Sequence, residues 1–171
     1  MANLRFGMAE VTGENLDNYE IFVAPERLPT NENRNTAKDG NPVFGSKYIF
    51  ERVRGKMIGH ARDTVIFIHG YNVSFKEALT SAAQLKQNFS QDAGGPGVNV
   101  VLFSWPSDGS MKPFLAYAND RQDATASGPA FARGLLKLAD FLRGSTPEEA
   151  CDHNVHLVAH SMGNYVLRHT V

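Results

Sequence analysis

Three short apolar runs, separated by segments with helical periodicity, constrain the fold of this chain more than any other feature. Residues 64–68 are apolar and mostly β-branched, and residues 98–103 and 155–159 form similar runs. Continuous runs of this kind favour parallel strands that are buried on both faces of a sheet. Their alternation with helical segments predicts βαβ units with right-handed crossovers. We therefore expect an α/β fold, a mostly parallel sheet with helices on both faces.

Weaker patterns define the remaining elements. Strands are also expected at residues 3–11 and 19–24, and helices at residues 47–58, 75–89 and 117–143. Gly128-Pro129 predicts a kink or restart in the last helix, because proline cannot donate to the preceding turn. Ser74 and Glu77 predict a capping box at the start of the second. Residues 25–45 read as a polar loop, and residues 1–171 as a single domain.

Composition excludes several classes of partner. The net charge of −1 provides no general attraction to nucleic acid, and no apolar run approaches the roughly 18 residues of a membrane span. A single cysteine, Cys151, allows no internal disulfide and favours a reducing compartment. Because the N-terminus also lacks the apolar core of a signal peptide, we expect a cytoplasmic protein.

The apolar run at residues 155–159 ends at a serine between small residues. Ser161 follows this predicted strand, precedes a segment compatible with a helix, and has Ala159 and Gly163 two residues away on either side. A nucleophile elbow needs small residues at these positions, so that strand and helix can approach around a strained serine. Glycine is usual at both positions, so Ala159 is a mild departure. The alternative is a serine at an ordinary strand end.

A second feature favours the elbow. Acyl transfer to serine needs two backbone N–H groups for the developing oxyanion, one from the residue after the nucleophile and one from a loop after an earlier strand. That loop should lie at His69-Gly70-Tyr71-Asn72, directly after the most apolar strand. Tyr71 and Met162 are therefore the candidate donors. Gly70, Asn72, His160 and Gly163 are candidate supporting residues.

These motifs together resemble an uncharacterised family of the α/β-hydrolase superfamily. The resemblance runs from about residue 44 to the end and rests on four stretches: residues 65–72, 103–107, 117–120 and 160–164. It implies a sheet of about five strands in the order one, two, four, three, five. It also implies a serine hydrolase acting on carboxylic esters or related acyl compounds, with Ser161 as nucleophile and an acyl-enzyme intermediate.

The chain departs from this family pattern after the serine. The triad of this fold runs Ser, Asp or Glu, His, yet only eight residues follow Gly163, and no acid is among them. His169 is about two helical turns from Ser161, roughly 12 Å, which is too far for a general base. His69 is expected to hold its loop by hydrogen bonds, and His160 to point away from Ser161. We expect an N-terminal fragment, truncated after the nucleophile helix and nearly inactive alone.

Other chemistries have weaker support. His156 and His160 share the spacing of a zinc-protease motif but lack its glutamate and lie on a predicted strand. Cys151, Asp152, His153 and His156 look like a metal cluster, but His153 and His156 should point to opposite faces of a strand. We predict neither a metal nor a cofactor. Asp108, Asp120 and Asp123 either border the pocket or, as is commoner, are solvated. Tyr117 and Asp120, one helical turn apart, are candidates to brace the loop at Trp105, which is itself either a pocket wall or a core residue.

Without later strands, the strand at residues 155–159 becomes an exposed apolar edge, which predicts self-association. The alternative to a serine hydrolase is a non-catalytic binding or scaffolding module on the same fold.

Overall fold

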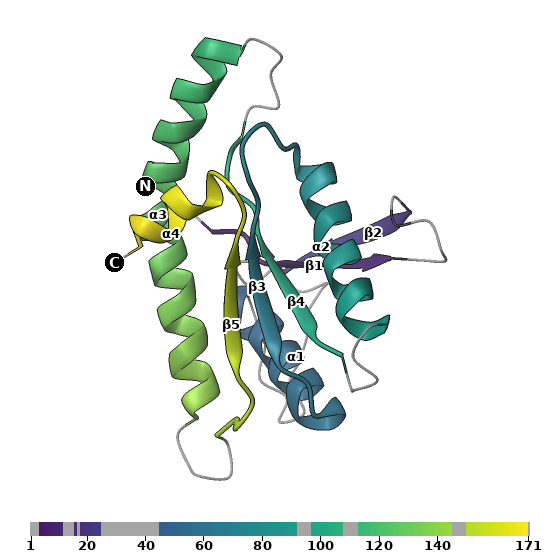
Figure 1. Cartoon of the computed structure of the whole chain (residues 1–171). Coiled ribbons are helices and arrows are strands. Elements are labelled where there is room, and N and C mark those ends of the chain that lie inside the picture. Colours follow the sequence, from purple (N-terminus) through teal and green to yellow (C-terminus); the bar gives the residue numbers. More distant parts are fainter. Residues whose placement is uncertain are drawn as a thin grey trace, which may run out of the picture.

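A parallel sheet of three strands forms the centre of the computed structural model (Figure 1). The structure describes residues 4–11, 16, 18–24, 45–91, 97–107, 113–144 and 150–170. The strands are β3 (Thr64–Ile68), β4 (Asn99–Phe103) and β5 (Val155–Ala159), in the order β4-β3-β5. Thr64 pairs with Asn99 and Val155, and Ile68 pairs with Phe103 and Ala159, so all three strands end at the same level. This shared end is where chain segments distant in sequence meet.

Helices cover both faces of this sheet. They are α1 (Gly45–His60), α2 (Phe75–Gln91), α3 (Pro113–Arg143) and α4 (Gly163–Arg168). Figure 1 shows α2 on one side of the strands and α3 with α4 on the other. Every residue of β3 is buried, as expected for a central parallel strand covered on both faces. The predicted α/β class is therefore confirmed.

The main core lies between the sheet and the layer that α1, α3 and α4 form. Its buried members come from four elements and the loops beside them: Phe50, Met57, Ile66, Ile68, Trp105, Ala124, Phe131, Leu138, Leu142, Met162 and Val166. Burying each large aliphatic or aromatic side chain contributes about 1.5–3 kcal/mol. Because Met162 and Val166 are among them, the turn that carries Ser161 is anchored in the core.

The first two strands form a hairpin of their own. β1 (Gly7–Val11) pairs antiparallel with β2 (Tyr19–Val23), as a two-stranded sheet separate from the other three strands. The hairpin packs on α1 through edge-to-face contact of Phe6 with Phe50, ring centroids 5.6 Å apart, and through Phe22 beside Tyr48. The expected sheet of about five strands is thus wrong in strand number, although the order β4-β3-β5 agrees with the prediction.

The long helix also differs from the prediction. α3 begins at Pro113 and continues through Pro129 to Arg143, so there is no restart at Gly128-Pro129. Gly128 has a packing role instead, because a Cβ there would lie 2.5 Å from the His169 carbonyl oxygen. The glycine thus lets the end of α4 approach α3. The predicted capping box of α2 is confirmed: the Ser74 N–H donates to Glu77 at 2.8 Å and the Glu77 N–H donates to Ser74 Oγ.

Some predictions lie outside the described residues. These are most of the polar loop at residues 25–45, and Asp108. In the part of the chain that the structure describes, no helix combines the length and the apolar character needed to cross a bilayer. Within that part, β5 lies at an edge of the three-stranded sheet, and Leu157 on it is 39% exposed.

Candidate active site

Ser161 lies in the tight turn between β5 and α4, with a backbone φ of +49°. L-residues rarely adopt this left-handed conformation, and a residue other than glycine that adopts it is strained by about 1–2 kcal/mol. Two backbone bonds close the turn, from the Gly163 N–H to the His160 carbonyl at 2.8 Å and from the Asn164 N–H to the Ser161 carbonyl at 3.1 Å. The Asn164 side chain also donates to the Ser161 carbonyl, at 2.9 Å. The serine side chain remains exposed.

Position 163 requires a residue without a Cβ, because α4 begins directly against the end of β3. A Cβ on Gly163 would lie 2.6 Å from the carbonyl oxygen of Ile68 and 2.7 Å from that of His69. Both are backbone atoms of the neighbouring strand or its loop, so neither can rotate away. The predicted steric demand at this position is present, and its source is the strand beside β5.

The loop after β3 lies directly beside Ser161. We call residues 69–74 the β3 loop. A Cβ on Gly70 would lie 3.0 Å from Ser161 Cβ and 2.8 Å from His160 Nδ1. Gly70 therefore allows the β3 loop to approach the serine. Tyr71 follows Gly70, and Met162 follows Ser161, so the two candidate donors flank the point where the segments meet.

His69 is fully engaged in the structure of its own loop. The ring is 1% exposed and stacks on Trp105, with centroids 5.1 Å apart and planes 4° from parallel. Nε2 accepts the Trp105 backbone N–H at 3.2 Å, so the proton lies on Nδ1, which donates to the Gly70 carbonyl at 3.1 Å. The Trp105 indole N–H donates to the His69 carbonyl at 2.9 Å. Burial lowers the pKa of His69, which favours this neutral ring.

Trp105 is thereby a core residue, one of the two interpretations that the sequence left open. Its side chain is 3% exposed. With both ring nitrogens in use, His69 is not available as a general base in this arrangement.

Asp120 reaches the loop at Trp105, the role that the sequence suggested for it together with Tyr117, and it also reaches the β3 loop. The solvated position that is commoner for such an aspartate is not observed, because Asp120 is completely buried on α3. Its Oδ2 accepts the backbone N–H of Asn72 at 3.2 Å and the Ser107 hydroxyl at 2.7 Å. Ser107 Oγ in turn accepts the Val73 N–H at 3.2 Å. The ring of Tyr117, one helical turn before Asp120, packs against the Tyr71 ring with centroids 5.5 Å apart. The sequence did not indicate the contacts of these two residues with the β3 loop.

The remaining candidate bases are placed differently from one another. His160 is exposed, and its Nδ1 lies against Gly70. His169 follows the end of α4, where its Nδ1 donates to the Tyr165 carbonyl at 2.7 Å. Among the residues that the structure describes, no histidine side chain is hydrogen-bonded to Ser161. The described site therefore has a strained serine beside the β3 loop, without a histidine hydrogen-bonded to the serine.

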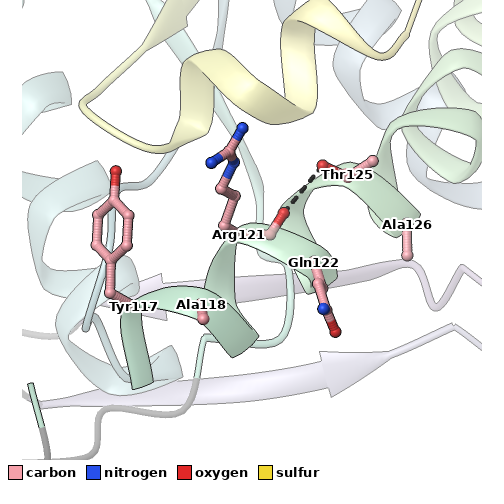
Figure 2. A pocket seen from close by; sticks show the side chains of 6 residues that line it. All are labelled: Tyr117, Ala118, Arg121, Gln122, Thr125 and Ala126. Carbon is pink, nitrogen blue, oxygen red and sulfur yellow. Dashed lines mark hydrogen bonds between the residues drawn. The ribbon is translucent and has the colours of Figure 1, made fainter. Parts of the chain in front are cut away.

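An open pocket of about 510 Å³ lies along α3 (Figure 2). The described residues that line it all belong to α3: Tyr117, Ala118, Arg121, Gln122, Thr125 and Ala126. The Arg121 guanidinium points toward α4 and lies 5.1 Å from the ring centroid of Tyr165 (Figure 2). None of the predicted site residues lines this pocket, but Tyr117 connects it to Tyr71.

A second polar cluster lies at the opposite end of the sheet. Asp63 accepts the Asn154 backbone N–H at 2.9 Å, and its other oxygen lies 2.9 Å from His156 Nε2. His153 Nδ1 lies 3.9 Å from Asp63 as well, because His153 precedes β5 and the strand alternation does not apply to it. The hydrogen bond from His156 is the main reason that the pKa of Asp63 is lowered. No group of three metal-ligating side chains is found within the described ranges.

Comparison with known proteins agrees with the geometry. The family model described as an alpha/beta hydrolase of unknown function (DUF900) matches residues 51–171. An uncharacterised protein of Nostoc sp. (alr1448) is 34% identical over 125 residues, which cover 61% of this chain and 30% of that protein. The chain thus matches less than a third of the length of this relative. No solved structure matches.

Proposed function

Because the chain belongs to this family of α/β hydrolases of unknown function, we propose that its protein is a serine hydrolase of carboxylic esters or related acyl compounds. Ser161 is the proposed nucleophile. The observation that carries the proposal is its backbone φ of +49° at the turn between β5 and α4. Strain of this kind persists only where the surrounding structure imposes it, and it is concentrated at functional sites. Here Gly70 and Gly163 provide the space in which that strained turn fits.

In the proposed reaction, Ser161 Oγ attacks the acyl carbonyl and an acyl-enzyme forms as the alcohol leaves. The negative charge that develops on the carbonyl oxygen is stabilised by the backbone N–H groups of Tyr71 and Met162. In other enzymes the loss of one such donor costs about 3–4 kcal/mol of transition-state stabilisation. Water then hydrolyses the acyl-enzyme.

His69 has a supporting role in this proposal. Its ring connects the β3 loop to the Trp105 backbone, so it positions the loop and does not take a proton from Ser161. The reaction therefore needs a general base and an acidic residue that orients this base. Among the described residues, no such base is hydrogen-bonded to Ser161. We expect a histidine to approach the exposed face of Ser161.

Labelling with a fluorophosphonate tests this proposal. The protein is expressed from its complete reading frame, and intact mass spectrometry measures the adduct. We expect one adduct on wild type and on the matched control Ser81→Ala, whose serine is exposed on α2, and none on Ser161→Ala. A folded wild type that does not react would contradict the proposal and would leave the non-catalytic module as the better hypothesis.

A further inference from the structure

We infer that Asp120 is a positioning residue that holds the β3 loop in the conformation needed for oxyanion binding. This role rests on the proposed function. Asp120 belongs to α3, is 48 positions from Asn72 in the sequence and is completely buried, yet it reaches the loop backbone directly. It does not contact Ser161 in any described interaction, so its effect on the reaction is transmitted through the loop.

The bonds of Asp120 converge on the turn after Tyr71. One carboxylate oxygen accepts both the Asn72 N–H and the Ser107 hydroxyl. Ser107 also accepts the Val73 N–H, so two successive amides of the loop are held by one carboxylate and one hydroxyl. Hydrogen bonds to a carboxylate are shorter and stronger than those between neutral groups, and a buried carboxylate requires such partners.

The backbone conformation of Asn72 is the reason that these hydrogen bonds matter. Its φ is +55°, a left-handed conformation in a residue other than glycine. The turn directly follows Tyr71, the proposed oxyanion donor, so its relaxation would rotate the neighbouring peptide groups. The ring of Tyr117, one turn earlier on α3, packs against the Tyr71 ring with centroids 5.5 Å apart. One helix thus contacts Tyr71 by an aromatic ring and the next amide by a carboxylate.

The direct test compares Asp120→Asn with Asp140→Asn in the full-length protein. Asp140 is also on α3, but its side chain is 72% exposed and pairs with Arg143. With p-nitrophenyl butyrate as substrate, we expect Asp120→Asn to lower kcat about 10- to 100-fold, because displacing a positioned group by about 1 Å has effects of that size. KM should change less than threefold, and Asp140→Asn should match wild type in both constants.

Amide hydrogen exchange supplies a readout that does not depend on activity. We expect exchange in residues 70–74 to become at least tenfold faster in Asp120→Asn, with the core strand β3 unchanged. A folded Asp120→Asn protein with wild-type kcat, or with lost activity but unchanged exchange in the loop, would overturn the inference. If Asp120→Asn does not fold, Ser107→Ala takes its place, with the same direction and a smaller loss expected.

Failure of the proposed function gives a different result. In that case Ser161→Ala keeps the esterase activity of wild type, which removes the catalytic role of Asp120 whatever the exchange data show. Unchanged loop exchange in Asp120→Asn instead overturns the positioning role while the Ser161→Ala result stands. The two failures are therefore distinguishable.

Discussion

Replacing Ser161 by glycine should stabilise the protein, although it removes the proposed nucleophile. The φ of +49° costs any residue with a Cβ about 1–2 kcal/mol, and glycine avoids this cost. Glycine loses about 0.5–1 kcal/mol through the greater freedom of the unfolded chain. The difference leaves Ser161→Gly more stable than Ser161→Ala by about 0.5–1 kcal/mol. Alanine is the proper reference, because it also lacks the hydroxyl and keeps the strained Cβ.

Thermal unfolding followed by circular dichroism measures this difference. In a protein of this size 1 kcal/mol corresponds to about 2–4 °C in Tm. Two controls bracket the result. Ala61→Gly, at another residue with a φ of +49°, should also stabilise the protein. Ser81→Gly, in the middle of α2, should instead be about 0.5–1 kcal/mol less stable than Ser81→Ala.

The outcome is decisive in both directions. If Ala61→Gly raises Tm and Ser161→Gly does not exceed Ser161→Ala, the backbone at Ser161 is not strained. The main observation behind the proposed nucleophile would then be lost. If both glycines stabilise and only the substitution at Ser161 abolishes fluorophosphonate labelling, the strain is part of the proposed active site.

Gly163→Ala should destabilise the protein by more than about 2 kcal/mol in urea unfolding, because its Cβ would meet two carbonyl oxygens at 2.6 and 2.7 Å. Gly59→Ala, whose Cβ would have no atom within 4 Å, should not destabilise it. Equal effects of the two substitutions would exclude the close approach at Gly163. The pKa of His69 is lowered from its ordinary value of 6.5, so the unfolded state binds the proton more readily than the folded state. The free energy of unfolding should therefore fall as pH decreases below about 6.5. Unfolding titrations from pH 7 to 5 should show a weaker dependence of this free energy on pH in His69→Asn. Asp63→Ala should lower the free energy of unfolding by about 1–3 kcal/mol, because it removes the hydrogen bonds of Asp63 with the Asn154 N–H and His156. A variant as stable as wild type would show that these bonds do not stabilise the pairing of β3 with β5.

The central fold was readable from the sequence because its signals are local. The apolar run of β3 predicts burial on both faces, and Ser74 with Glu77 predicts the start of α2. The place of the hairpin β1-β2 was not readable, because alternating residues predict a strand without showing which sheet it joins. Gly128 illustrates the same limit. As sequence it indicates a helix break, but in the structure it is the contact of α3 with the end of α4.

The candidate site divides in the same way. Ser161 and Gly70 were predicted from small residues beside a strand end, a pattern visible within five residues. For Asp120 the sequence suggested only the contact with the loop at Trp105. Its burial and its bond to the β3 loop were not predicted, because they depend on two loops that come together from distant parts of the chain. An aspartate on a helix is usually solvated, and the spacing from Tyr117 did not show that this one is buried.

Two kinds of interaction therefore hold the two halves of the site, and they should be separable by mutation. The turn at Ser161 is held by close backbone packing at Gly163 and Gly70, so changes there act first on the free energy of unfolding. The β3 loop is held by polar contacts of Asp120 and Ser107, whose replacement by near-isosteric groups alters geometry more than packing. Substitutions on the glycine side should thus lower Tm and kcat together, because the added Cβ displaces the turn that carries Ser161. Substitutions on the Asp120 side should lower kcat with a smaller change in Tm, and a single shared dependence of kcat on Tm across both sets would refute this division.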